Sequence, residues 1–297
     1  MLFRSIAGSL SITTGQDLTF GNWKAQDVRA VTVGLVDFNG HYSAGNLTAP
    51  TAITNPTGGA VRTLNLSAHE NLTLSGALSV TSGLGLRAGK AILGMPSSIS
   101  ISSPGTGVQL SSGADLVISS PISVNGPVVL SSLGAPGPDG SRTGGTVRVT
   151  SNISAGSGTV TVASSTADSI LSGTVLGGGF IKEGSGTLTV TGSLSSAGTV
   201  YVNAGTLLLN SSAKSMVVAD GATLGGTATL NGSLTVQAGG EVSPGNSPGI
   251  VTVNGDVNFQ SDSTSGPVTL VMELSGSVPG TDYDQIAVTG EIGRAHV

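Results

Sequence analysis

The sequence predicts an all-β protein, a parallel β-helix (β-solenoid) with three short strands per coil. Composition is the first reason: 47 of the 297 residues are glycine, aromatic residues make up 3% and charged residues 9%, whereas roughly 25% charged residues is typical of a globular protein. The second reason is that apolar residues recur in pairs at positions i and i+2, the period of a strand with one buried face. The third is that no sustained helical period competes with this pattern.

The pairs set the expected core. The second members of successive pairs fall six residues apart, at Val218, Leu224, Leu230, Val236 and Val242. Strands this short cannot bury a face alone, so they must stack on copies of themselves. We therefore expect these side chains to be buried: Leu188, Val190, Leu207, Leu209, Leu224, Leu230, Val236 and Val242. The alternation places Thr223, Thr229 and Thr235 on the exposed face.

The regular pattern is interrupted at residues 134–145 and 243–250, where proline and glycine predict loops that project from the stack. The first residues contain no apolar core of a signal peptide, and no stretch has the ~18 consecutive apolar residues of a membrane span. Residues 291–297 stop the pattern within a strand and read like a translated sequencing adapter. We therefore predict β-helix coils over 1–176 and 177–290, followed by a non-native tail at 291–297.

Charge and cysteine content exclude several classes of protein. A net charge of −5 and only 11 Lys and Arg residues give no basic stripe, so nucleic acid is not an expected partner. The absence of cysteine excludes disulfides, thiolate zinc sites and cysteine nucleophiles. Disorder is excluded because 38% of the residues are hydrophobic.

Six motifs, in this order, resemble the membrane-proximal end of autotransporter passengers. The first two, GTLTVTG at 186–192 and VYVNAGTLLL at 200–209, are similar to the autotransporter-associated β-strand repeat. The others are VADGATLGG (218–226), LTVQAGG (234–240), SPGNSPG (243–249) and YDQIAV (283–288). The part before residue 170 is only loosely similar to filamentous-haemagglutinin repeats.

This resemblance implies a right-handed β-helix on the cell surface, at the outer membrane or in the extracellular space. It also implies a signal peptide before the passenger and an outer-membrane β-barrel translocator, the expected partner, after it. We expect a structural stalk that serves adhesion by binding an unidentified ligand on a host or neighbouring cell. Two alternatives are a polysaccharide-active β-helix lyase or hydrolase and a two-partner-secreted filamentous haemagglutinin fragment.

Two short motifs fit catalytic patterns. Residues 245–249 match the G-x-S-x-G nucleophile elbow, but the residue after Ser247 is Pro248, which has no N–H for an oxyanion hole. A tight turn is expected there instead. Ser211 and Lys214 fit S-x-x-K, a pattern so short that a loop is the better interpretation.

The acidic residues and the three histidines are mostly scattered singly along the sequence. The only close carboxylate pair is Asp282 and Asp284, for which a loop cap or solvated edge is expected rather than glycoside hydrolysis. His41 and His69 are isolated, and His296 lies in the tail, which argues against a left-handed β-helix acyltransferase as well. We therefore predict no enzyme activity and no catalytic, cofactor-binding or metal-binding residue.

Overall fold

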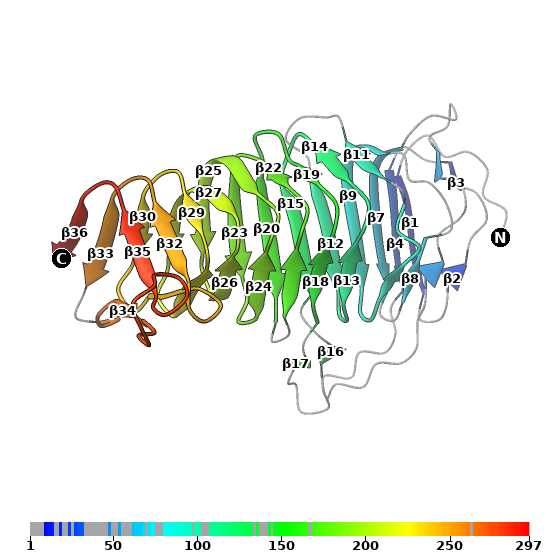
Figure 1. The fold of residues 1–297 in the computed structure, drawn as a ribbon. Helices are drawn as coiled ribbons and strands as arrows, with labels where there is room; N and C mark the ends of the chain where they lie inside the picture. The colour runs from blue at the N-terminus through cyan, green and yellow to red at the C-terminus, as the bar shows by residue number, and fades with distance from the viewer. Residues whose placement is uncertain are drawn as a thin grey trace. The chain divides into compact units, whose positions relative to one another are not determined.

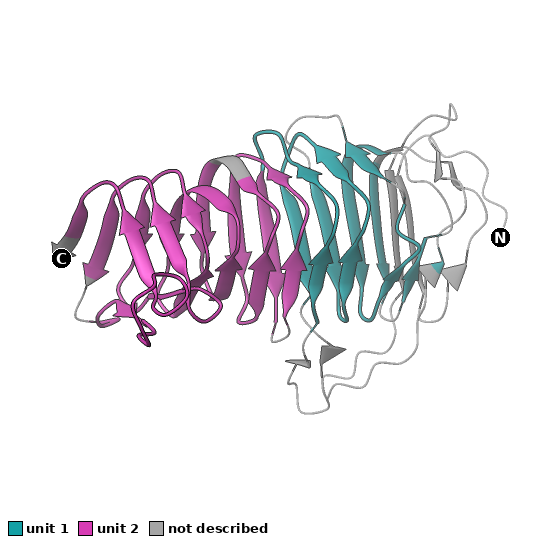
Figure 2. Cartoon of the chain, in the orientation of Figure 1, with its two compact units in different colours: residues 1–158 teal, residues 159–297 magenta. Residues whose placement is uncertain are grey.

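The computed structural model consists of strands, and no helix occurs among the residues it describes (Figure 1). Those residues are 61–68, 71–74, 80–96, 98–101, 107–132, 145–165, 168–261 and 264–296, together with short strands at 9–14, 18–19, 23–24, 27–32, 47–48, 53–54, 135–136 and 142–143. The chain divides into two compact units, Met1–Gly158 and Thr159–Val297 (Figure 2). The boundary expected at 176/177 separates two kinds of repeat, which is a different property from this division into compact units, and it stays a prediction.

One coil of the first unit shows the repeating plan. Strands β12 (Val108–Ser112), β13 (Leu116–Ile118) and β14 (Ile122–Val124) follow one another, and β15 (Val128–Ser132) begins the next coil. β12 and β15 pair in parallel, with Leu110 beside Leu130. Each coil therefore contributes one short strand to each of three parallel sheets.

The other strands of the first unit extend these sheets. The long sheet runs β1 (Ser9–Thr14), β4 (Asp27–Thr32), β7 (Val61–Ala68), β9 (Val80–Ala88), β12 and β15. β13 pairs with β18 (Val147–Val149), and β14 lies between β11 (Ile99–Ile101) and β19 (Ile153–Ser154). A further sheet contains β2 (Leu18–Thr19), β5 (Leu47–Thr48), β8 (Leu72–Thr73) and β10 (Ile92–Leu93), and β3 (Trp23–Lys24) pairs with β6 (Ile53–Thr54). Within the predicted loop at 134–145, β16 (Ala135–Pro136) and β17 (Arg142–Thr143) pair antiparallel.

The second unit repeats the plan. Its long sheet runs β20 (Thr159–Ser164), β23 (Gly179–Glu183), β25 (Leu194–Val202) and β27 (Ser212–Val218), then divides into β29 (Thr229–Leu230), β32 (Ile250–Val253) and β35 (Gln285–Val288), and into β30 (Leu234–Val236), β33 (Val257–Ser261) and β36 (Ile292–His296). A second sheet contains β21 (Ser169–Leu171), β24 (Thr187–Val190), β26 (Gly205–Leu209), β28 (Ala222–Gly226), β31 (Glu241–Pro244) and β34 (Thr269–Leu270). β22 (Val175–Leu176) lies between β21 and β23 in the chain.

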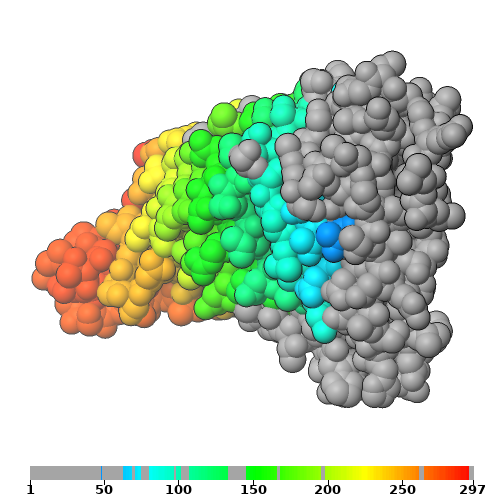
Figure 3. All heavy atoms as spheres, turned by 90° about the vertical axis from the view of Figure 1, so that its right-hand side faces the viewer, coloured from blue at the N-terminus to red at the C-terminus, as the bar shows by residue number. Residues whose placement is uncertain are grey.

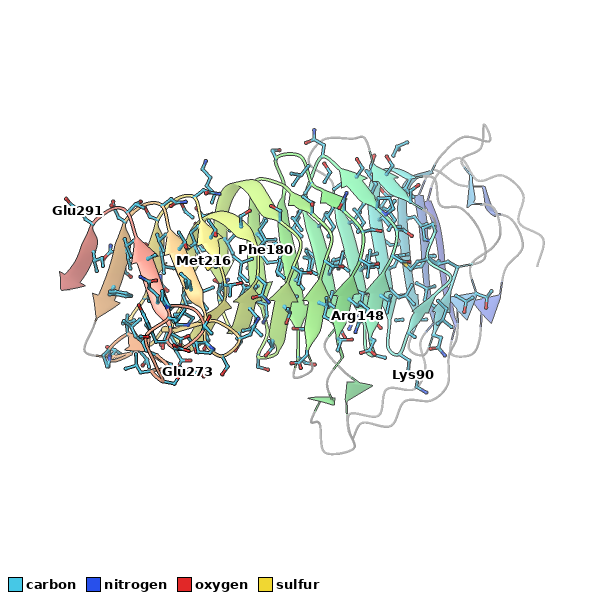
Figure 4. All side chains as sticks on the ribbon, viewed as in Figure 1. Lys90, Arg148, Phe180, Met216, Glu273 and Glu291 are labelled. Atoms are coloured by element: carbon cyan, nitrogen blue, oxygen red, sulfur yellow. The ribbon has the colours of Figure 1, made fainter. Side chains whose placement is uncertain are left out.

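The core of the second unit consists of aliphatic columns that run from coil to coil. One column contains Leu188, Leu207, Leu224 and Val242, each beside the next in register. Another contains Val160, Phe180, Val200 and Met216, and Figure 4 shows Phe180 and Met216 among the strands. In the space-filling view the coils of this unit, from green to orange, adjoin as continuous bands (Figure 3).

The predicted core is confirmed. All eight aliphatic side chains named from the sequence are fully buried at 0% exposure: Leu188, Val190, Leu207, Leu209, Leu224, Leu230, Val236 and Val242. The fold class is confirmed as well, because the regular elements of the described residues are all strands, in parallel sheets stacked as a β-solenoid.

The prediction that Thr223, Thr229 and Thr235 are exposed is wrong in degree, because all three are half-buried. Their side chains point outward, as the alternation requires, but parallel in-register stacking places another outward side chain beside each of them. Thr223, for example, lies between Thr206 and Glu241. The register stands, and the partial cover comes from neighbouring coils.

Residues 291–297 include a strand. β36 pairs in parallel with β33, with Val257 beside Ile292. This pairing continues the sheet and leaves the hypothesis of a non-native tail untested.

Candidate functional site

The structure brings two of the candidate motifs together. The carboxylate of Asp284 accepts hydrogen bonds from the backbone N–H of Gly249 (2.7 Å) and from the backbone N–H of Glu273 (2.8 Å). Asp284 is only 4% exposed. One buried side chain therefore joins the turn at 245–249 to the segment at 273–284. More than 20 residues separate these two segments in the chain.

Ser247 makes the second contact between these segments. Its Oγ donates to the Glu273 carboxylate, 3.1 Å from Oε1 and 2.9 Å from Oε2. Ser247 has a φ of 91°, a left-handed conformation that a residue with a side chain adopts only when its surroundings impose it. Figure 4 shows Glu273 on the loops beside the stack.

Asp282 closes the second loop on itself. Its Oδ2 accepts hydrogen bonds from the backbone N–H groups of Ser277 and Val278, both at 3.0 Å. Asp282 and Asp284 thus turn to different partners, and each satisfies two backbone donors. Their hydrogen bonds are those of loop caps, which is the interpretation that the sequence favoured over a pair of catalytic carboxylates.

The surroundings of Ser247 do not match those of a serine nucleophile in an acyl-transfer site. The hydroxyl donates to a carboxylate rather than to an imidazole, and Pro248 offers no N–H to an oxyanion. The turn at 245–249 instead forms an antiparallel bridge to the neighbouring coil, between Gly245 and Gly226. The described geometry is that of a closed turn.

The interpretation of Ser211 to Lys214 as a loop is wrong in part. Ser211 lies at a corner and donates to the carbonyl of Gly192 (2.6 Å), but Lys214 belongs to strand β27 and is exposed. The short hydroxyl-to-carbonyl bond ties one coil to the previous one. The Ser211 hydroxyl therefore helps to hold two adjacent coils together.

Several acidic and amide residues at the corners do the same. Asp115 Oδ1 accepts from the backbone N–H of Thr146 (2.8 Å), Asp256 Oδ1 from Glu291 N–H (2.9 Å) and Asn210 Oδ1 from Thr227 N–H (3.1 Å). In each pair the two residues belong to different coils. These polar side chains cap the backbone of the next coil.

Within the described part of the chain, no group of three or more His, Cys, Asp or Glu residues could hold a metal ion. His41 and His69 lie outside the described residues, and of His296 only the backbone is described. No helix among the described residues is long and apolar enough to cross a membrane.

Sequence reasoning missed one buried charge, Lys182. This side chain is 0% exposed, in strand β23. The signal was available, because Phe180 and Lys182 stand two apart, 20 positions after Val160 and Val162 and 20 before Val200 and Val202. Alternation alone therefore places Lys182 in the core.

Comparison with known proteins gave no relatives. No profile of a protein family, no curated protein and no solved structure matches this chain.

Proposed function

We propose that this chain is a structural stalk of a secreted or surface-exposed bacterial protein of the autotransporter-passenger kind, and that it serves adhesion. The proposal combines the motif resemblance at 186–288 with one structural observation, the character of the outward-facing columns. A lyase or hydrolase needs several charged side chains close together on one face. A stalk needs only columns of uncharged polar side chains.

Two of the outward columns consist mainly of hydroxyl side chains, whereas another mixes them with uncharged apolar ones: Thr161, Ile181, Tyr201, Val217 and Thr235. Ser100, Ser123 and Ser154 lie beside one another in the first unit. In the second unit a longer outward column contains Thr187, Thr206, Thr223, Glu241 and Thr269. The described charges occur singly within such columns, as Glu241 does between threonines and as Arg87 does beside Ser111.

Such columns suit a stalk for a physical reason. Hydroxyl side chains in an in-register parallel stack can bond to one another and to water, and β-branched threonine favours the extended backbone. The aliphatic columns inside supply most of the stability, because each coil buries its apolar face only against its neighbours. The loops that project from the stack remain free to vary in sequence.

Display on a bacterial surface tests the proposal. The chain would be placed between a signal peptide and an outer-membrane β-barrel translocator in a non-adherent strain, with the translocator alone as control. We expect protease added to intact cells to degrade the chain, and we expect increased attachment to epithelial cells or to cells of the same strain. A chain that stays inside the cell, or that is displayed without any gain in attachment, would contradict the proposal.

A second measurement separates the stalk from the enzyme. Purified protein would be incubated with pectate, alginate and xylan, and unsaturated products and reducing ends would be measured. The stalk hypothesis expects neither to form above the level of a heat-denatured sample. Sustained product formation would favour the polysaccharide-active alternative.

A further inference from the structure

Lys182 lies in an apolar column of the second unit. In β23 it points inward with Phe180, and its register partners in the flanking strands are Val162 and Val202. Its exposure is 0%. A charged side chain in such a position is rare in proteins unless its charge is matched by specific partners.

The partners are backbone carbonyls. The ammonium Nζ donates to the carbonyl oxygens of Gly184 (2.7 Å), Glu183 (2.9 Å) and Ala204 (3.1 Å). An ammonium has three N–H donors, so every donor has an acceptor. Glu183 and Gly184 belong to one coil and Ala204 to the next, and the side chain therefore bridges two successive corners.

Both corners bend at a glycine. Gly184 has a φ of 75° and Gly205 a φ of 65°, values that glycine adopts without steric cost. The three carbonyl oxygens that meet at Nζ flank these two bends. Carbonyl oxygens gathered around a single point are the arrangement by which a protein backbone coordinates a monovalent cation.

The electrostatic surroundings are simple. The side chains beside Lys182 in β20 and β25 are the apolar Val162 and Val202. The charged neighbour is Glu183, whose carboxylate accepts a hydrogen bond from Asn203 Nδ2 at 2.7 Å. Burial lowers the pKa of the Lys182 ammonium from 10.5 to about 8, and Glu183 opposes this change. The group is therefore still charged at neutral pH.

We propose that the three carbonyls of Glu183, Gly184 and Ala204 form a monovalent-cation site, and that the Lys182 ammonium is its tethered occupant, which locks the corner of one coil to the corner of the next. The ligand class follows from the geometry: a primary ammonium that donates three hydrogen bonds. A free alkylammonium should enter the same site once the lysine side chain is removed.

Chemical rescue tests this assignment. Lys182→Ala removes three methylenes and the amine, which n-propylammonium replaces atom for atom. We expect the full-length variant to lose about 1 M in its urea midpoint at pH 7, and 50 mM n-propylammonium chloride to restore at least half of that loss. Tetramethylammonium chloride, which has no N–H donor, should restore nothing. Equal recovery in the two salts, or none in either, would overturn the proposal.

Val162→Ala is the matched control. It leaves a cavity in the same column but keeps the lysine in place, so n-propylammonium should not raise its urea midpoint. Rescue of this variant to the same extent would show that the amine merely fills apolar space, and would also overturn the assignment.

A measurement on the unaltered protein covers the case in which Lys182→Ala does not fold. The chain contains only four lysines, Lys24, Lys90, Lys182 and Lys214, so labelling with ¹⁵N-lysine gives few signals. A caged ammonium exchanges its protons slowly with water. We expect a sharp ammonium signal at pH 6.5 with nuclear Overhauser contacts to Val162 and Val202 methyl groups. Its absence in the folded protein would refute the cage.

Discussion

The buried carboxylate of Asp284 accepts a hydrogen bond from the backbone N–H of Gly249, 35 residues earlier in the chain, at 2.7 Å. The same carboxylate binds the N–H of Glu273, so a single side chain holds three points of the last coils together. The Gly249 N–H donates to Oδ1 and the Glu273 N–H to Oδ2, so both N–H groups are satisfied only when both carboxylate oxygens accept. This gives the contact a measurable consequence.

Asp284→Asn should destabilise the C-terminal coils. The amide keeps the shape but replaces one accepting oxygen with a donor, so one of the two backbone N–H groups faces another N–H. Hydrogen bonds to charged groups contribute about 1.5–3 kcal/mol each, and we expect a loss of about 2 kcal/mol in urea melts. Protease cleavage between residues 250 and 290 should increase. Glu291→Gln, at an exposed position, is the control and should change neither measurement.

Alternation along the chain was enough to identify the core. Phase and spacing are local properties of a strand, so Leu224, Leu230 and Val236 could be assigned to the inside without knowing their neighbours. The exposure of Thr223 depends on which side chains stand beside it in adjacent coils, and the spacing of pairs does not contain that information.

The contacts between the turn at 245–249 and the segment at 273–284 could not be predicted for a similar reason. Asp284 and Gly249 belong to separate motifs, and nothing in either motif specifies the length or path of the segment that brings them together. Lys182 is a different case, because its phase placed it inside. The carbonyl oxygens that accept its hydrogen bonds come from two successive corners, and their meeting point is visible only in three dimensions.

Lys182 should make stability depend on pH in the alkaline range. Its folded pKa of about 8 lies below the ordinary lysine value of 10.5 that applies to an unfolded chain. Between these values the unfolded state binds more protons, so the free energy of unfolding should rise as pH increases from 8 towards 10.5. Below pH 8 both states are protonated, and this contribution should be constant.

Urea melts at half-unit intervals from pH 7 to 10 would measure this effect, with Lys182→Met as the control that lacks the titrating amine. The difference in unfolding free energy between the two proteins should change with pH. Parallel curves for the two proteins would show that the pKa of Lys182 is the same in the folded and the unfolded chain.

The repeat-matched segment should be the more stable part of the chain. Residues 177–290 contain columns in which each side chain is buried against the next, and in a solenoid stability is the sum of the coils and their interfaces. We expect hydrogen exchange to show slower opening there than in residues 1–170, and unfolding in urea to reach this segment last. The opposite order would mean that the motif resemblance does not track stability.

Val236→Asp should cost far more than Thr235→Asp, although the two residues are neighbours in β30. Val236 is 0% exposed and lies between Val218 and Phe259 in an inward column. Thr235 points outward, half-buried between Val217 and Asn258. An unpaired carboxylate in the column should cost several kcal/mol even if it protonates, whereas the outward aspartate should cost about 1 kcal/mol in strand propensity and lateral contacts.

Because each coil is stabilised by its neighbours, the effect of the inward aspartate should spread. Met216 and Val218 of β27 lie directly beside Leu234 and Val236, and loosening β30 removes one side of their packing. We expect new protease cleavage in β27 and β33 for Val236→Asp and none for Thr235→Asp. If urea melts of the two full-length variants gave the same loss of stability, β30 would not be a strand with one buried and one outward face, and the assignment of the core would fail at its most regular point.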